Sequence, residues 1–376
     1  MDFTITDEQS MLADSVTRFI DNDYSFEKRM KIAESDAPFS EAIWQNFAEL
    51  GWTAMLFDEV DGGFDGDAIE LMIMMEQFGR GLVVEPFLAN IVLAGGVLKR
   101  CANEAQKARW LTGIIEGNTH AALAFVEPQS RYNVADMTTT AKKHGEGWQV
   151  NGQKGLVLNG GNADVLIVPA RTAGKQTDTA GITLFAIDAK TAGVSCNSYK
   201  TVDAMSAAEV VLENVLVDAD SVLGEANEGF KVLESVLRDA TLAVSAEAVG
   251  IIRTMHDKTV EYSKQRVQFG VPIGSFQALQ HRMVDTLMAC ELTRSLLFRA
   301  AMLMADSSDD ADRAVSELKY MIGTAGRKVA QEAVQLHGGM GVTWEFDIAH
   351  FFKRLTAIEL MFGNADHHLD RMAGLA

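Results

Sequence analysis

Residues 148–158, WQVNGQKGLVL, show the pattern of a strand, a turn and a second strand. Within this stretch the dipeptide Asn151-Gly152 is typical of a type I′ turn between two short β-prone runs. Further short apolar runs with β-branched residues follow at 165–169, 181–187 and 209–217. The connections are too short for βαβ crossovers, so we expect antiparallel strands. The pattern predicts a middle β-barrel-like domain over residues 119–229.

Helical patterns lie on both sides of this β segment. On the amino-terminal side, Thr6 followed by Gln9 is a capping box, and a second helix begins after Ser40. We expect an α-helical domain over residues 1–118. On the carboxyl-terminal side the apolar residues recur at helical spacing in four long stretches, which predicts a four-helix bundle over residues 230–376. The four stretches are 240–266, 276–305, 311–337 and a part of 348–372. The sequence therefore predicts a mostly α-helical, three-domain α–β–α protein with a central antiparallel β domain.

Composition and charge exclude several classes of function. The 376 residues include 33 basic and 52 acidic side chains, which gives a net charge of −19. Such a surface repels phosphate backbones and anionic lipids, so we expect no nucleic-acid partner. No apolar run reaches the roughly 18 residues of a membrane span, so we expect no membrane span. The polar segment MDFTITDEQS has no signal or transit character, and three scattered cysteines favour a reducing cytoplasm.

Standard ligand motifs are missing from the sequence. It has no GxGxxG after a strand, no P-loop, no HExxH and no CxxC. The acidic segment 58–67, DEVDGGFDGD, fails the EF-hand test, because counting from Asp61 places Gly63 third and Met72 twelfth. His367 and His368 are adjacent on a helix and point about 100° apart, so we expect a surface or capping role and no metal.

Five other motifs resemble those of the acyl-CoA dehydrogenase family, in the family's order and over essentially the whole chain. They are Glu127-Pro128; 148–154 with 159–161; 223–224 with 228–230; 266–277, RVQFGVPIGSFQ; and 335–341, QLHGGMG. The resemblance implies a helical domain, a β domain and a four-helix bundle, assembled as a tetramer. It also implies the cofactor FAD and α,β-dehydrogenation of an acyl-CoA thioester. In that reaction a glutamate removes the α-proton and the β-hydrogen leaves as hydride to the flavin, and an electron-transfer flavoprotein accepts the electrons.

The family's FAD spans two subunits, and this sequence keeps the motif that meets the ADP half of a neighbour's FAD. Arg266 and Phe269 match the arginine and phenylalanine of that motif, and Gln335, Gly338 and Gly339 match its glycine turn. A guanidinium can pair with pyrophosphate, and glycines allow close backbone approach. At least one of the two glycines should have a positive φ. The alternative interpretation is a solvated arginine and a helix C-cap.

The flavin-ring side departs from the family pattern. Tyr132 stands where the family has a serine, Val126 where it has a threonine, and 156–158, LVL, where it has Trp-x-Thr. The family's two base positions correspond to Ala240 and Gly363, and neither residue can accept a proton. Glu247 lies seven residues after Ala240, on the same helix face, and is the candidate for a substitute base. Two helical turns, about 11 Å, separate the two positions.

The chain most resembles the small, base-lacking subunit of heteromeric acyl-CoA dehydrogenases, such as the pimeloyl-CoA and steroid side-chain types. The shared segments are 130–132, 246–250, 276–281 and 362–369. Three hypotheses remain open. The chain is the non-catalytic partner of a homologous catalytic subunit that binds the acyl-CoA; or a self-sufficient homo-oligomeric dehydrogenase that uses Glu247; or a scaffold without activity. The first implies a hetero-oligomer acting in fatty acid or steroid side-chain degradation.

Overall fold

The computed structural model describes residues 5–374, which form two compact units. The helical unit contains residues 5–31, 67–83 and 241–374, and the sheet unit contains residues 32–66 and 84–240. Helices α2 (Phe26–Glu34) and α8 (Gly229–Gln265) contribute residues to both units. The fold is that predicted from the sequence, mostly helical with a central sheet.

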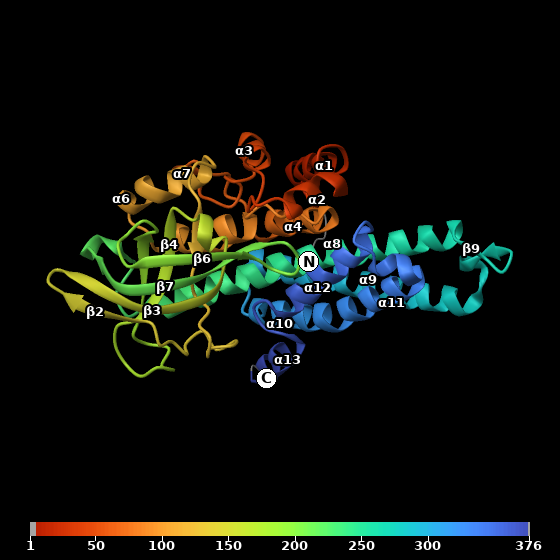
Figure 1. Cartoon of the computed structure of the whole chain (residues 1–376). Coiled ribbons are helices and arrows are strands. Elements are labelled where there is room, and N and C mark those ends of the chain that lie inside the picture. Colours follow the sequence, from red (N-terminus) through yellow and green to blue (C-terminus); the bar gives the residue numbers. More distant parts are fainter. Residues whose placement is uncertain (1–4, 375–376) are drawn as a thin grey trace. The chain divides into compact units, whose positions relative to one another are not determined.

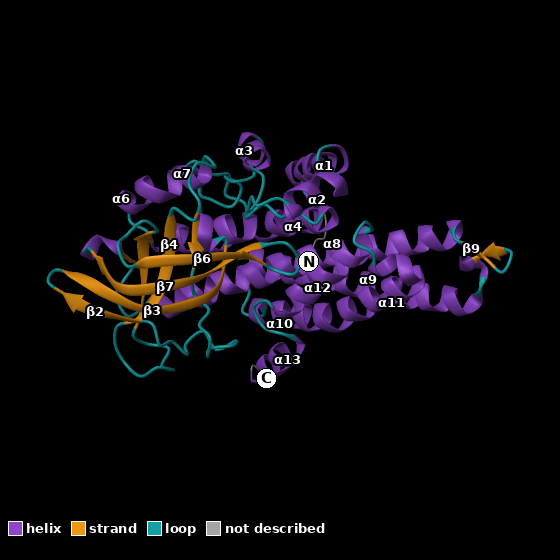
Figure 2. Ribbon diagram, in the orientation of Figure 1, coloured by secondary structure: helices purple, strands orange, loops and turns teal. Residues whose placement is uncertain are grey.

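The sheet unit is built on eight strands, drawn in orange in Figure 2. Their order is β6-β7-β3-β2-β4-β5-β8, and β1 pairs with β4. Most pairs are antiparallel as predicted, but β1 pairs with β4 in parallel over three residues, and β2 meets β4 in parallel at Thr140 and Arg171. The strands are β1 (Ala121–Leu123), β2 (Thr140–His144), β3 (Gly147–Leu158), β4 (Val165–Arg171), β5 (Ile182–Asp188), β6 (Val194–Lys200), β7 (Ser206–Val217) and β8 (Val222–Leu223).

The predicted turn at Asn151-Gly152 is wrong, because β3 runs straight through these residues. The hairpin turn lies earlier, where His144 of β2 pairs with Gly147 of β3, and Gly145 has a φ of +59°. Gly152 serves another purpose: a Cβ there would lie 2.3 Å from Thr139 Oγ1, so only glycine fits this close approach. The strand also has a register shift against β7 between Val150 and Gly152.

Short helices complete the sheet unit. Apolar side chains, including Trp148 and Phe185 in edge-to-face contact at 5.7 Å, fill its core. The helices are α3 (Glu41–Glu49), α5 (Gly96–Cys101), α6 (Glu104–Gln106) and α7 (Thr112–Ile115), with π-helical segments η2 (Leu88–Gly95) and η3 (Lys107–Leu111). The acidic segment 58–67 forms a loop with one short turn, η1 (Glu59–Asp61).

The helical unit contains the long helices predicted for the carboxyl-terminal part. The first begins at Gly229, earlier than the predicted Ala240. The predicted helix 311–337 includes a π-helical segment, and the stretch 348–372 contains two helices separated at Phe362 and Gly363, which both have positive φ. The elements are α1 (Asp7–Asn22), α4 (Ala68–Gly81), the later part of α8, β9 (Val267–Gln268), β10 (Val271–Pro272), α9 (Gln277–Ala305), α10 (Ala311–Met321), η7 (Ile322–Gly326), α11 (Arg327–His337), η8 (Gly338–Val342), α12 (Asp347–Leu360) and α13 (Ala365–Gly374).

Local sequence signals explain how two of these helices begin and pack. The Thr6 side chain accepts a hydrogen bond from the Gln9 N–H, and the Gln9 side chain accepts one from the Thr6 N–H, which confirms the capping box. Helices α4 and α8 meet through glycines. A Cβ at Gly79 would lie 2.0 Å from the Glu247 carbonyl oxygen, and one at Gly250 would lie 1.9 Å from the Glu76 carbonyl oxygen. Both positions therefore require glycine for this helix contact.

Candidate functional site

Arg266 and Phe269 lie on the hairpin that joins α8 to α9, at the end of these two helices (Figure 1). Strand residue Gln268 pairs with Val271, so Phe269 and Gly270 form a two-residue turn, with φ of +55° and +81°. A two-residue hairpin turn of this kind requires a positive φ at both central residues, although the conformation is strained for phenylalanine. The Phe269 side chain is 92% exposed and contacts the Phe276 ring at 6.2 Å. The hairpin therefore presents an aromatic ring to the outside of the chain.

The Arg266 guanidinium is available for a ligand. Its residue is exposed, and within residues 5–374 its side chain makes no hydrogen bond or ion pair. The Arg266 N–H donates to the Tyr262 carbonyl at 2.8 Å, and its carbonyl accepts from the Ile273 N–H at 2.8 Å. The backbone is thus fixed at the root of the hairpin while the cationic end of the side chain remains free.

The glycine turn follows the end of α11. Gln335 is exposed, and its carbonyl accepts the Gly338 N–H as a helix C-cap. Gly338 has a φ of +61°, so the prediction of a positive φ at this turn is confirmed. A Cβ at either Gly338 or Gly339 would meet no atom within 4 Å. No atom of the described chain therefore requires glycine at Gly339, and the space in front of the turn is open to another molecule.

Sequence reasoning did not identify the residue that joins these two segments. Tyr262, four residues before Arg266, lies against His337, the residue just before Gly338, with ring centroids 4.4 Å apart. The only available signal was its position one helical turn before the arginine. The structure thus connects the arginine hairpin and the glycine turn through contacts between Tyr262 and His337.

Two motifs in the sheet unit form a buried ion pair. Lys154 Nζ donates to Glu127 Oε1 at 2.7 Å, and both side chains are at most 1% exposed. The Thr138 and Thr139 N–H groups also donate to the Glu127 carboxylate, at 2.7 and 3.1 Å. Burial alone would raise the pKa of Glu127, but Lys154 and hydrogen bonds from the Thr138 and Gln129 side chains hold it at about 2. Burial lowers the pKa of Lys154 to about 8. This pair anchors the loop after Glu127 to β3 and has a structural role.

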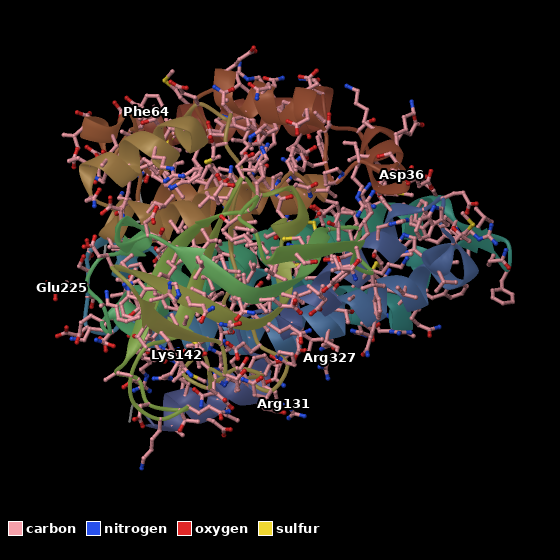
Figure 3. The ribbon with its side chains drawn as sticks, turned by 60° about the vertical axis from the view of Figure 1, so that its left-hand side comes forward. Asp36, Phe64, Arg131, Lys142, Glu225 and Arg327 are labelled. Atoms are coloured by element: carbon pink, nitrogen blue, oxygen red, sulfur yellow. The ribbon has the colours of Figure 1, made fainter. Side chains whose placement is uncertain are left out.

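Near this ion pair, the positions expected to contact a flavin ring have apolar or bulky side chains. Leu156 is 45% exposed with a φ of +47°, at a register shift of β3 against β7 between Lys154 and Val157. Val126, Tyr132 and Leu158 are half-buried. The preceding Gly155 N–H donates to the Val126 carbonyl at 2.9 Å. Arg131 and Lys142, labelled in Figure 3, are exposed on the neighbouring loop and on β2. The leucine and valine side chains offer no hydrogen-bonding group to a flavin.

Glu247, the candidate substitute base, is bound to an arginine. Its two carboxylate oxygens accept from Arg354 Nε at 2.6 Å and Nη2 at 2.8 Å. Both side chains are about 5% exposed or less. A bidentate, buried ion pair occupies both oxygens and fixes the position of the carboxylate. This arrangement favours a structural role for Glu247.

The structure also fills the space at the second base position. Gly363 has a φ of +109°, and a Cβ there would lie 2.4 Å from His367 Cδ2 and 2.8 Å from His368 Nε2. Lys319 Nζ donates to the carbonyls of Glu359 at 3.0 Å and Gly363 at 2.7 Å. Burial lowers the pKa of Lys319 to about 7. A glutamate at position 363 would therefore need both a strained backbone and displaced histidines.

His367 and His368 cap and fill the turn before α13. The His367 N–H donates to the Asn364 side chain at 3.0 Å, and His368 Nε2 bonds to the Phe362 carbonyl at 3.1 Å. Burial lowers the pKa of His368 to about 3, so this imidazole stays neutral. In the part of the chain that the structure describes, no group of three or more His, Cys, Asp or Glu side chains could hold a metal ion. No described helix is long and apolar enough to cross a membrane.

Comparisons with known proteins give one consistent result. Three family models match in order: acyl-CoA dehydrogenase N-terminal domain over residues 6–118, middle domain over 122–215 and C-terminal domain over 227–374. The structure of butyryl-CoA dehydrogenase from Megasphaera elsdenii has a TM-score of 0.92 at 28% identity, covering 100% of this chain and 99% of the other.

Two further similar proteins belong to complexes. The structure of the ChsE4-ChsE5 complex from Mycobacterium tuberculosis has a TM-score of 0.89 at 26% identity, covering 100% of this chain and 98% of the other. The caffeyl-CoA reductase-Etf complex subunit CarC of Acetobacterium woodii is 29% identical over 85% of each chain.

Proposed function

Since the chain belongs to the acyl-CoA dehydrogenase family, we propose that it is the non-catalytic subunit of a heteromeric acyl-CoA dehydrogenase. It supplies the ADP half of the FAD site to a homologous catalytic subunit, which holds the flavin ring, the base and the acyl-CoA. The family resemblance supports an oxidoreductase with FAD as cofactor. The division of labour between the two subunits is the new element of the proposal.

The observation that carries the proposal is the closed space at Gly363. A φ of +109° and the two histidines leave no room for a side chain. Alanine stands at the other base position, Ala240, and is fully buried. Glu247, the candidate substitute on the same helix, is paired with Arg354. Neither family base position therefore carries a carboxylate, and the candidate substitute is engaged in an ion pair.

The residues present fit one half of FAD and not the other. On the ADP side, the free Arg266 guanidinium suits a pyrophosphate, and the open turn at Gly338 and Gly339 allows it to approach the backbone. On the ring side, Leu156 and Val126 cannot satisfy the polar atoms of an isoalloxazine. Bound FAD supplies the hydride acceptor of the reaction. This chain's residues position the cofactor by its ADP end.

An exposed apolar stripe on α9 supports association through the helical unit. Val284, Met288 and Leu292 follow one another at four-residue spacing, and each is more than half exposed, with Leu287 beside them at 38%. A stripe of this kind on a helix is typical of a helix–helix interface. The resemblance to a chain of the ChsE4-ChsE5 complex also favours a two-chain assembly. An electron-transfer flavoprotein is the expected electron acceptor, and the similarity to CarC supports it.

The test is to co-express the chain with a homologous dehydrogenase chain that keeps the glutamate base, and to count flavin. We expect one FAD per heterodimer and negligible acyl-CoA dehydrogenation by the lone chain, since a positioned base contributes roughly 10²–10⁴-fold. Arg266→Ala should weaken FAD binding about 10- to 150-fold, because it removes a charge-assisted contact. Arg327→Ala is the matched control, an exposed arginine of the same unit that is labelled in Figure 3.

The alternatives give different results in the same experiment. Turnover by the lone chain that is abolished by Glu247→Gln would establish a self-sufficient dehydrogenase. Two FAD molecules per heterodimer, or an FAD affinity unchanged by Arg266→Ala, would overturn the proposal. A chain that binds no partner and no flavin would be a scaffold.

A further inference from the structure

We infer that Tyr262 and His337 are positioning residues that hold the Arg266 hairpin and the Gly338-Gly339 turn in one fixed arrangement for a dinucleotide. The two residues belong to different helices and are 75 positions apart in the sequence. This inference rests on the proposed function, because the dinucleotide is the ADP half of the partner's FAD.

Tyr262 is rigidly connected to Arg266. It lies in the last turn of α8, and its carbonyl accepts the Arg266 N–H at 2.8 Å. Four residues of helix correspond to a rise of about 6 Å. A shift of the Tyr262 ring would therefore be transmitted to the root of the hairpin. Few other contacts can fix the position of the hairpin, because every residue from Lys264 to Pro272 is exposed.

His337 is rigidly connected to the glycine turn. It is 3% exposed, and Nδ1 lies 2.8 Å from the Ala333 carbonyl of the same helix. A carbonyl only accepts, so Nδ1 carries the proton. Its ring packs between Tyr262 and Phe346, with a centroid distance of 5.3 Å to the latter. The next residue is Gly338, whose positive φ begins the turn. The imidazole therefore anchors the end of α11.

Two interactions join Tyr262 to His337. The Tyr262 and His337 rings stack at 4.4 Å with an interplanar angle of 30°, and the Tyr262 hydroxyl donates to the His337 carbonyl at 3.4 Å. The hydrogen bond is long, so ring stacking is the larger contribution. Burial lowers the pKa of His337, although the hydrogen bond to the Ala333 carbonyl and nearby Asp347 oppose the shift. Lys258, paired with Asp347 at 2.8 Å, acts in the same direction as burial.

The fixed arrangement matters because each half of the site is weak alone. A free guanidinium on an exposed hairpin binds an anion poorly unless its position is set in advance, and an exposed glycine turn binds no ligand by shape alone. Held at a constant separation, the two contact the same ligand at two points. Loss of the aromatic contact should therefore lower FAD affinity even where the chain stays folded.

The experiment uses the assembled heterodimer and measures FAD affinity for Tyr262→Leu, Tyr262→Phe and Arg266→Ala, alone and combined. We expect Tyr262→Leu to weaken binding roughly 3- to 15-fold, from the value of an aromatic pair. Tyr262→Phe keeps the stack and should stay within about twofold of the parent. The combined Tyr262→Leu/Arg266→Ala variant should bind about as weakly as Arg266→Ala alone, because the leucine acts through the arginine.

A second measurement needs no flavin. Hydrogen exchange of the peptide covering residues 335–345 should be faster in Tyr262→Leu than in the parent, and unchanged in Tyr262→Phe. The control is His256→Phe. His256 lies on α8, as Tyr262 does, and the substitution removes its buried 2.8 Å hydrogen bond to Thr286 of α9. It should leave both FAD affinity and exchange at 335–345 unchanged.

The outcomes separate this inference from the proposed function. If Arg266→Ala weakens FAD binding but Tyr262→Leu does not, the positioning role is wrong and the proposed function stands. Effects of the two substitutions that add independently also contradict positioning. If neither substitution changes FAD affinity, the proposed function itself is wrong.

Discussion

The closed space at position 363 makes a prediction about restoring the base. Gly363→Ala, and equally Gly363→Glu, should destabilise the helical unit substantially. A non-glycine residue at a φ of +109° adds roughly 1–3 kcal/mol of backbone strain. The new Cβ would also lie 2.4 Å from His367 Cδ2, whereas ordinary carbon contacts are about 3.5–4.0 Å. Relieving that overlap adds about 1–3 kcal/mol, so the total is roughly 2–6 kcal/mol.

The chain offers a control that separates strain from overlap. Gly270, in the same unit, has a φ of +81° and no atom within 4 Å of a built Cβ. Gly270→Ala should therefore show the strain alone, about 1–3 kcal/mol. Adding His367→Ala to Gly363→Ala removes the closest atom, His367 Cδ2, and should recover part of the lost free energy of unfolding. The assay is urea denaturation followed by circular dichroism, fitted for the free energy of unfolding.

The reasoning is refuted if Gly363→Glu unfolds at the same urea concentration as the parent. It is equally refuted if the lone Gly363→Glu chain dehydrogenates an acyl-CoA, because position 363 would then have room for a working base. A loss no larger than that of Gly270→Ala, and unaffected by His367→Ala, would show that the histidines do not close the space.

Three further predictions follow from single interactions. Gly339→Val should lower the FAD content of the heterodimer more than it lowers Tm, because its Cβ meets no atom of the chain; equal flavin occupancy would leave only a C-cap role for the turn. Glu247→Gln should lower the free energy of unfolding, measured in urea, by about 3–5 kcal/mol, because it leaves the buried Arg354 charge uncompensated. The double substitution Glu247→Leu/Arg354→Met should recover most of that loss. A loss below about 1 kcal/mol in Glu247→Gln would contradict the buried pair. The pKa of Lys319 falls from 10.5 to about 7 on folding, so between these pH values the unfolded chain binds one more proton than the folded chain. The free energy of unfolding should therefore rise with pH from about 7 to 10.5. Lys319→Met should abolish that rise, measured as the difference between parent and variant, and a parallel pH dependence of the two proteins would contradict the shift.

The positive φ of the glycine turn was predictable because its signal is local. A positive φ at Gly338 follows from a glycine directly after an amphipathic helix. The capping box at Thr6 is likewise contained within four residues. In each case the physical cause lies within one turn of the chain, so one sequence is enough to predict it.

The same local reasoning failed at Asn151-Gly152, where a strong turn signal lies inside a strand. There the close approach of Thr139 decides the use of Gly152, and Thr139 is thirteen residues away in the sequence. The start of α8 at Gly229 and the parallel pairing of β1 with β4 were also not predicted. These features depend on which segments pack together, and periodicity does not contain that information.

The sequence by itself determined the order of helical and β segments, the glycine turn and the absence of a carboxylate at both family base positions, because each depends on residue identity or local periodicity. Only the tertiary structure decided how the residues at and around these positions interact. It pairs Glu247 with Arg354, 107 residues away, closes position 363 with His367 and His368, and joins Arg266 to the glycine turn through Tyr262 and His337. These are contacts between side chains brought together by packing, and their distances exist only in the folded chain.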